Sequence, residues 1–410
     1  MFPKEWQLCK IGDIAETTSG GTPSRKNKEY YDGNISWVKS GELEDCDIYS
    51  TEEKITEEAL KKSSAKLFPK GTLLIAMYGA TVGKTAMLRI DAATNQAVCA
   101  IFPKNKLTRA EFIRYFFIYA RPTLLSHRYG GAQPNISQTV IRNFQIALPT
   151  LDEQQNIAHI LSKIQSAIET QEKIIQTTAE LKKALMQKLF TEGLKGEPQK
   201  ETEIGRVPKS WELKKIKEIC DIGTGGTPST KINDYYSPPE INWLKSGDIN
   251  GLYVTEVNNK ISKLGKSNSN ANTLFPHGSI MIAMSGRGKT RGTTAILKVE
   301  STCSQSVAAI VPKGQIISEF LHFSLSYRYN EIRNITGHTD RSGLNLGLIE
   351  NIKVFLPSLE EQEKISKVFV TVEERIELAK TKQEILRNLF KSTLHHLMTG
   401  QIRVKDLRFS

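Results

Sequence analysis

The sequence consists largely of one segment written twice. Four short runs of residues reappear in the same order further along the chain, beginning with GGTPS. The paired runs lie at residues 20–24 and 225–229, 35–41 and 241–247, 67–69 and 274–276, and 148–154 and 356–362. The offset drifts only from 205 to 208 residues, so the two copies differ by small insertions. Because the units of solenoids are typically ~20–50 residues long, this duplication predicts two similar domains instead of a solenoid.

Positive charge is concentrated on the two repeated regions. The net charge is +12, with 20 Lys and Arg against 15 Asp and Glu in residues 1–151, and 21 against 15 in residues 193–359. Residues 152–192 and 360–398 are close to neutral. Basic domains bind polyanions because each neutralised phosphate releases a counterion. The charge favours nucleic acid as a partner, and a solubilising surface is the alternative.

Each copy has the pattern of a mixed α+β domain. Short apolar runs bounded by Gly and Pro, such as residues 72–77 and 279–284, predict strands. A helical stretch follows in each copy, at residues 109–120 and 317–329. Each copy has enough apolar residues to form a core of its own.

Each copy ends in a long helical pattern with a narrow apolar seam. In residues 157–189 and 365–397 the seam positions, most of them apolar, step alternately by three and four positions, which is typical of a coiled coil. Acidic residues follow a proline at the start of each pattern, and Gly193 and Gly400 follow its end, as expected at helix termini. No other segment has a complementary seam of that length. We therefore expect the two helices to pair antiparallel in a rod of about 60 Å, with one domain at each end.

The predicted fold class is α+β, with two similar globular domains of mixed α/β structure separated by two long helices that pair as an antiparallel coiled coil in a pseudo-twofold repeat. The predicted segments are a first domain at 1–151, a first long helix at 152–192, a linker at 193–210, a second domain at 211–359, a second long helix at 360–398 and a tail at 399–410.

Motifs for catalysis are missing or incomplete. Residues 79–85 are similar to a phosphate-binding P-loop, but three residues separate the glycines where that loop needs four, and the matching stretch at 286–290 is shorter still. We expect a glycine-rich basic loop that touches a DNA backbone, with a plain tight turn as the alternative. No Asp/Asn-Pro-Pro-aromatic motif of adenine methylation is present, and the scattered histidines predict no metal site. The sequence therefore predicts a non-catalytic protein.

The five cysteines lack CxxC spacing and do not recur at equivalent positions of the two copies. They predict free thiols in a reducing compartment. No run approaches the ~18 apolar residues of a membrane span, and the N-terminus lacks the apolar core of a signal peptide. We expect a cytoplasmic protein without membrane contact.

Several motifs occur in a fixed order, most of them twice. They are the two GGTPS runs, the two Leu-Pro-x-Leu-x-Glu-Gln helix starts, the leading segments 3–6 and 204–211, the run at 131–137 and the closing run at 397–404. With these motifs the chain resembles, over its whole length, the specificity (S) subunit of type I restriction-modification enzymes. It departs from the pattern at residues 337–342, where Gly-His-Thr-Asp-Arg-Ser replaces the Gln-Pro-Asn-Ile-Ser run of the first copy.

The resemblance implies two target recognition domains, each reading one half of a split, asymmetric site in double-stranded DNA. It implies that the paired helices set the distance between the domains and help to dock two methyltransferase (M) subunits, with restriction (R) subunits as further partners. S-adenosylmethionine, ATP, Mg and the catalytic residues then belong to the partner subunits. The family changes its spacer length through four-residue units in the first long helix, and residues 178–181 resemble one such unit.

Base readers are expected where the two copies diverge, whereas shared motifs serve the fold and backbone contacts. The divergent stretches are 42–66 against 248–273, the two glycine loops, and 128–143 against 335–351. The candidate phosphate or guanine contacts are Lys84, Arg287, Lys289 and Arg291, and the candidate base readers are Gln133, Asn135, Arg341 and Asn345. For each of them, an exposed or fold-supporting polar residue is the alternative. Trp37 and Trp243 are expected in the domain cores.

The predicted function is a sequence-specific DNA-binding subunit that directs methylation and restriction by its partners. A coiled-coil scaffold that joins proteins without reading DNA is the first alternative, and the division of the positive charge disfavours it. A P-loop NTPase is the second, and the spacing of the glycines disfavours it. A specificity subunit for a single partner that both methylates and cleaves is a further alternative.

Overall fold

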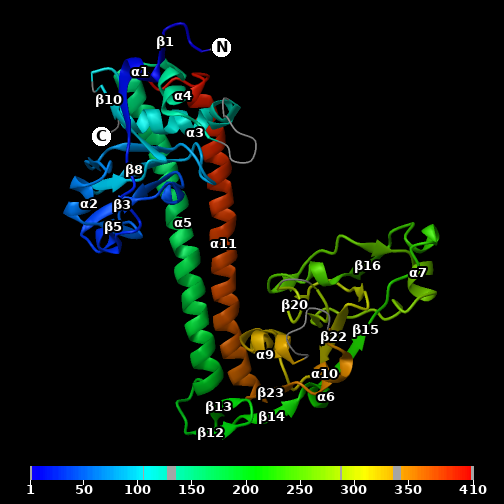
Figure 1. Ribbon diagram of the computed structural model, residues 1–410. Coiled ribbons are helices and arrows are strands. Elements are labelled where there is room, and N and C mark those ends of the chain that lie inside the picture. The colour runs from blue at the N-terminus through cyan, green and yellow to red at the C-terminus, as the bar shows by residue number, and fades with distance from the viewer. Residues whose placement is uncertain (1, 105, 127–134, 287–288, 336–342, 408–410) are drawn as a thin grey trace. The chain divides into compact units, whose positions relative to one another are not determined.

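The computed structural model describes residues 2–104, 106–126, 135–286, 289–335 and 343–407. The chain forms two compact units, which are Met1–Gln171 with Lys382–Ser410, and Glu172–Thr381. Each unit contains one globular domain and a part of each of two long helices (Figure 1).

The globular domain of the first unit is built of short strands and helices. In chain order these are β1 (Gln7–Lys10), α1 (Ile11–Ile14), β2 (Ala15–Ser19), β3 (Ile35–Val38), β4 (Cys46–Ile48), β5 (Glu53–Ile55), α2 (Glu57–Lys61), β6 (Leu67–Phe68), β7 (Leu73–Ala76), β8 (Thr85–Leu88), β9 (Ala92–Thr94), β10 (Val98–Pro103), α3 (Ala110–Ser126), α4 (Gln138–Asn143) and β11 (Gln145–Leu148).

A five-stranded sheet in the order β2-β10-β7-β8-β4 is the centre of this domain. Side chains of β7 alternate between its faces: Leu73 and Ile75 lie in a core with α3, while Leu74 and Ala76 lie in a core with the four-stranded sheet β5-β3-β9-β6. All four side chains are fully buried, as expected of a strand that is covered on both faces. The domain is therefore a three-layer α+β structure, as the apolar runs predicted.

The globular domain of the second unit repeats this plan, with the central order β15-β22-β19-β20-β17. Its elements are β12 (Gln199–Thr202), β13 (Gly205–Pro208), β14 (Glu212–Lys215), α6 (Ile216–Ile219), β15 (Cys220–Thr224), β16 (Ile241–Leu244), β17 (Tyr253–Val254), β18 (Lys260–Ile261), α7 (Lys263–Ser267), β19 (Ile280–Ala283), β20 (Thr294–Leu297), β21 (Thr302–Cys303), β22 (Val307–Pro312), α8 (Ser318–Tyr327), α9 (Tyr329–Asn334), α10 (Leu346–Glu350) and β23 (Lys353–Leu356). A three-stranded sheet β18-β16-β21 stands where the first domain has four strands.

The GGTPS runs belong to the frame of each domain. The indole N–H of the buried Trp37 donates to the Gly21 carbonyl over 3.1 Å, and Trp243 donates to the Gly226 carbonyl over 2.9 Å. The structure thus confirms the prediction that both tryptophans are core residues. The repeated motif is conserved between the copies because it closes the same contact in each.

Two long helices, α5 (Leu151–Glu192) and α11 (Leu359–Met398), carry the two seams. They contain 42 and 40 residues. Each ends before a glycine with a left-handed backbone, Gly193 at φ +65° and Gly400 at φ +70°, a conformation that favours glycine.

The two helices pack against each other in both units (Figure 1). In the first unit, Leu161 near the start of α5 shares a core with Leu397 near the end of α11. In the second unit, Phe190 near the end of α5 stacks on Phe369 near the start of α11, with ring centroids 5.6 Å apart. The start of one helix meets the end of the other in each unit, so the pairing is antiparallel, as the seams predicted.

A buried carboxylate at the start of each long helix joins the helix to its domain. Glu153 accepts hydrogen bonds from the Trp6 indole over 3.3 Å and from Arg403 Nε over 2.7 Å. Burial opposes ionisation of this carboxyl group, but the Arg403 guanidinium outweighs burial and holds the pKa of Glu153 below its ordinary value. Its counterpart Glu361 is also buried, yet its cation Lys195 is largely exposed and 3.7 Å away.

We expect Glu153→Gln to lower the free energy of unfolding by about 3 kcal/mol, because it removes the buried carboxylate partner of Arg403 and leaves only the exposed Glu5. Glu361→Gln is the matched control and should cost about 1 kcal/mol, since the exposed Lys195 is screened by water. Urea denaturation followed by tryptophan fluorescence measures both. The lowered pKa of Glu153 means that its contribution is present above about pH 4.3 and is lost as the pH falls further, so the two curves of wild type and Glu153→Gln should converge in acid. Equal losses for both variants at pH 7 would contradict the assignment.

The first glycine of each GGTPS run should not tolerate a side chain. A Cβ on Gly20 would lie 2.1 Å from the Thr94 carbonyl oxygen, and a Cβ on Gly225 would lie 1.8 Å from the Cys303 carbonyl oxygen. We expect Gly20→Ala and Gly225→Ala each to cost about 3 kcal/mol or more, because backbone must move to relieve the overlap. Gly41→Ala, where nothing lies within 4 Å of the new Cβ, should change stability by less than about 0.5 kcal/mol. Thermal melting of the three variants is the measurement, and a stable Gly20→Ala protein would refute the close packing.

Candidate nucleic-acid interface

The divergent stretches of each domain meet at the glycine loop that follows the central strand. In the first domain, Ile136 N donates to the Met77 carbonyl over 2.8 Å, and Asn135 forms an isolated antiparallel β-bridge with Tyr78. In the second domain, Leu344 N donates to the Met284 carbonyl over 2.8 Å. The described residues of the third divergent stretch therefore lie beside the start of the glycine loop in each domain.

The first glycine loop joins β7 to β8, which are antiparallel neighbours. A P-loop needs a helix N-terminus after its glycines, and here a strand follows instead. Thr81 Oγ1 donates to the Ser40 carbonyl over 2.6 Å, so the loop also contacts the segment that leads into the first divergent stretch. The geometry excludes the P-loop interpretation and brings the divergent parts of the domain together.

An aspartate with a strained backbone holds this loop in place. Asp45 has φ +59°, and its carboxylate accepts from Thr85 N over 3.0 Å and from Arg121 Nη2 over 2.5 Å. Arg121 Nε also donates to the Gly83 carbonyl over 2.9 Å. At the matching position before β17 the second domain has Gly251 at φ +72°. Sequence reasoning missed Asp45, although a glycine at the equivalent position of the other copy is the signal of a left-handed turn.

The second glycine loop is held by different side chains. The Tyr329 hydroxyl donates to the Lys289 carbonyl over 2.7 Å, and Arg333 Nη1 donates to the Arg291 carbonyl over 3.4 Å. In each domain a helix that follows the central sheet, α3 in the first and α9 in the second, donates hydrogen bonds to carbonyls of the glycine loop. The donor residues are of different types in the two domains. The frame is shared while its chemistry differs between the domains.

The predicted site residues fall into three groups. Lys84, Asn135 and Lys289 lie at or beside the glycine loops, whereas Arg291 is buried and Asn345 accepts a hydrogen bond from Leu348 N over 2.9 Å as the N-cap of α10. The remaining candidates, Gln133, Arg287 and Arg341, lie outside the described residues. The DNA contacts of all eight residues stay predictions, and Asn345 has a structural role beside them as a helix cap.

Two of the loop lysines differ in their electrostatic surroundings. Lys84 forms an ion pair with Glu44, so part of its charge is already neutralised. Among the ion pairs of the described residues, none includes the exposed Lys289. Lys289 is therefore the lysine of the two whose full charge faces water.

The described part of the chain offers no catalytic constellation. No three His, Cys, Asp or Glu side chains gather there as a metal site. His322 is buried, which lowers its pKa to about 3, and its Nδ1 lies 3.0 Å from Thr294 Oγ1, so it is a neutral core residue. All five cysteines are free, as predicted, and burial raises the pKa of the Cys99 thiol to about 12.

Among the described helices, none has the length and apolar character that crossing a membrane requires.

Comparison with known families matches residues 3–178 and again residues 208–388 to the type I restriction modification DNA specificity domain. The chain belongs to this family. It is a DNA specificity subunit of a type I restriction-modification system, the non-catalytic component of such a system. The scaffold and NTPase alternatives are thereby set aside.

Similar proteins cover almost the whole chain. The specificity subunits of the type I restriction enzymes MjaVIII and MjaIX from Methanocaldococcus jannaschii are 28% and 27% identical, over 99% of this chain and 95% of each relative. A crystal structure of a type I specificity subunit from M. genitalium has a TM-score of 0.66 at 15% identity, with 96% of both chains covered. The fold of two mixed α/β domains and two packed long helices is thus the fold of the family.

We expect Lys289→Gln to weaken DNA binding uniformly across sequences and to lower the slope of log affinity against log salt by about one, because one phosphate contact is lost. Lys217→Gln on α6, which removes an exposed lysine outside the glycine loop, is the matched control and should leave the slope unchanged. Fluorescence anisotropy of the assembled methyltransferase on labelled DNA at several salt concentrations measures both. Identical slopes for Lys289→Gln and wild type would remove Lys289 from the interface.

Proposed function

We propose that each domain of this subunit reads one half of a bipartite, asymmetric site in double-stranded DNA. The helix pair sets the distance between the two half-sites, and two methyltransferase subunits and the restriction subunits carry out the chemistry. S-adenosylmethionine, ATP and Mg bind to those partners. The subunit itself then contributes recognition and geometry.

The observation that carries this proposal is the contrast between a shared frame and different loops. Both domains have the same strand order and the same tryptophan–glycine contact. Around the glycine loop, however, one domain uses Asp45 and Arg121 where the other uses Tyr329 and Arg333. Two similar frames with different reading surfaces fit two half-sites of unrelated sequence.

Exposed apolar side chains on the long helices support docking of methyltransferase subunits. In the second unit Leu181 and Leu378 are 51% and 69% exposed, and in the first unit Ile385 and Leu389 are 61% and 49% exposed. Leu378 and Ile385 lie outside the predicted seam, whereas Leu181 and Leu389 lie at or beside it and are exposed all the same. Apolar side chains in contact with water on a helix favour burial against another protein.

The test is methylation sequencing of DNA from cells that express this chain with its partner methyltransferase. We expect N6-methyladenine at one split, asymmetric motif, because each domain recognises its own half-site. Replacing residues 1–151 with the corresponding domain of another family member should change one half of the motif and leave the other half and the spacer unchanged. If the methyltransferase is active yet no motif depends on this chain, or if the exchange alters both halves, the proposal is wrong.

A further inference from the structure

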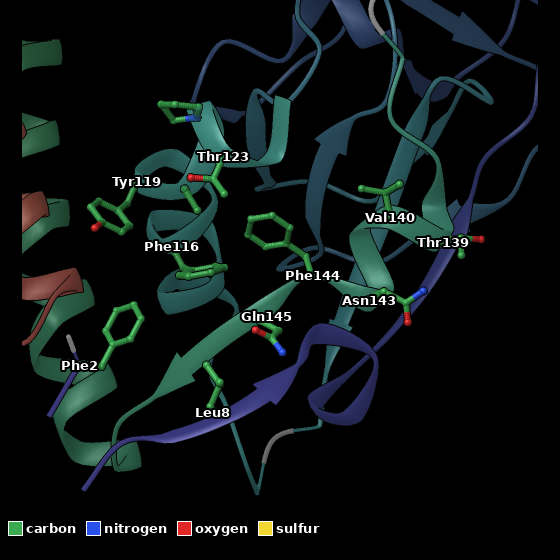
Figure 2. Close-up of a pocket in the computed structure, with 12 residues that line it drawn as sticks. Phe2, Leu8, Phe116, Tyr119, Thr123, Thr139, Val140, Asn143, Phe144 and Gln145 are labelled. Atoms are coloured by element: carbon green, nitrogen blue, oxygen red, sulfur yellow. The ribbon is translucent and has the colours of Figure 1, made fainter. Parts of the chain in front are cut away.

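An apolar groove is open on the first domain (Figure 2). Its volume is about 900 Å³. Its lining includes Phe2, Leu8, Phe116, Tyr119, Ala120, Phe144 and Gln145, and the other lining residues are uncharged as well. None of these side chains carries a charge at neutral pH, although the domain as a whole is basic. A surface without cations is unsuited to a phosphate backbone, so the groove fits a protein segment better than DNA.

The groove combines a buried aromatic floor with exposed apolar edges. The rings of Phe116 and Phe144 are 5.9 Å apart and almost fully buried. At the edges, Leu8 is 58% exposed and Phe2 is 42% exposed. Large side chains of this kind are costly to leave in water, and a covering segment would gain roughly 25 cal/mol for each Å² of apolar surface that it buries.

The second domain shows what covers the equivalent surface. With the offset of 208 residues, Ser324, Tyr327 and Arg328 correspond to Phe116, Tyr119 and Ala120. These three residues line a cavity of only about 80 Å³, together with Ile204, Gly205 and Arg206 from the β12–β13 hairpin. The hairpin therefore closes the second groove with an aliphatic side chain at its turn.

An ion pair holds that cover in place. Glu203 in the hairpin pairs with Lys353 on β23, and the Lys353 carbonyl in turn accepts a hydrogen bond from Arg328 beneath the hairpin. At the corresponding positions the first domain has Gln145 and Ala120, a neutral amide and a small side chain. No described residue covers the first groove as the hairpin covers the second.

We propose that the first groove docks an apolar turn or extended segment of one methyltransferase subunit, in the manner in which the hairpin covers the second groove. This inference rests on the proposed function for the presence of that partner. The groove adjoins the helix pair, since its residue Tyr119 contacts His395 of α11 with ring centroids 5.9 Å apart. A subunit bound along the exposed apolar side chains of α11 in this unit has the groove beside it.

A second copy of this chain is the less suitable occupant. The segment of the chain with the right chemistry, the β12–β13 hairpin, is already seated on its own domain through Ile204 and the Glu203–Lys353 ion pair. Releasing it would expose the second groove in order to cover the first. A partner subunit covers the first groove without that loss.

The test compares two substitutions of exposed leucines in the first domain. Leu8→Glu places a charge at the edge of the groove, whereas Leu67→Glu is the matched control, because Leu67 is 49% exposed and does not line the groove. Native mass spectrometry of the full chain titrated with its methyltransferase measures affinity and stoichiometry. We expect Leu8→Glu to weaken one of the two methyltransferase positions at least tenfold and Leu67→Glu to leave both unchanged.

A second variant fills the groove from within. Ala120→Arg introduces the residue that the second domain has at this position, and it should weaken the same single position without lowering the melting temperature by more than a few degrees. A photo-crosslinking amino acid at position 8 identifies the occupant in the assembled complex. We expect a crosslink to the methyltransferase from position 8 and none from position 67.

The outcomes separate this inference from the function on which it rests. Groove docking is wrong if Leu8→Glu and Ala120→Arg bind the methyltransferase with full affinity, or if position 8 crosslinks to a second copy of this chain. The proposed function still holds in that case if methylation occurs at a split motif. Absence of methyltransferase binding by the wild-type chain overturns both.

Discussion

The structure depends on a buried glutamine that fixes the start of each long helix on its own domain. Gln154 donates its amide N–H groups to the Leu107 and Pro149 carbonyls over 3.1 and 2.9 Å, and its carbonyl accepts from Thr108 Oγ1 and Arg109 N. Because both ends of this fully buried amide are satisfied, the first turn of the helix is held against the domain. Gln362 repeats this arrangement with the Gln315 and Pro357 carbonyls and Ile317 N. The same junction therefore anchors the start of each long helix to its own domain.

The two copies keep this frame, but the side-chain contacts around it differ between them. In the first domain, Asp47 pairs with Arg114 on α3 over 2.8 Å, close to the turn that holds the glycine loop. The second domain has His322 at the position of Arg114, and it is neutral and buried beside Thr294. An ion pair is thus replaced by an uncharged hydrogen bond on the same scaffold. Loops with different supporting networks can diverge without disturbing the strand order, which suits a subunit whose two domains recognise different sequences.

Sequence patterns predicted the large features because they repeat or are periodic. The doubled motifs predicted two α+β domains, and the stepping of apolar residues predicted two antiparallel helices, since periodic burial leaves a periodic signature. Individual side-chain roles were beyond such patterns. The side chain of asparagine can read a base or cap a helix, so its type does not decide between the two roles. The contact with Leu348 N shows that Asn345 caps α10. Gly251 in the other copy signals the left-handed turn at Asp45, but the contacts of its carboxylate depend on partners that are distant in sequence, such as Arg121.

The linker between the two copies gives the two domains different surfaces, although their repeated motifs predict similar ones. The segment before the second domain folds into the β12–β13 hairpin and covers a surface that is open on the first domain. The same strand pairing and helix junction therefore present an apolar groove in one unit and a polar, closed face in the other. A partner that binds by apolar burial distinguishes these faces even though the underlying frame is duplicated. The pseudo-twofold symmetry of the chain is consequently a property of its core, and the asymmetry of its surface begins in the linker as well as in the glycine loops.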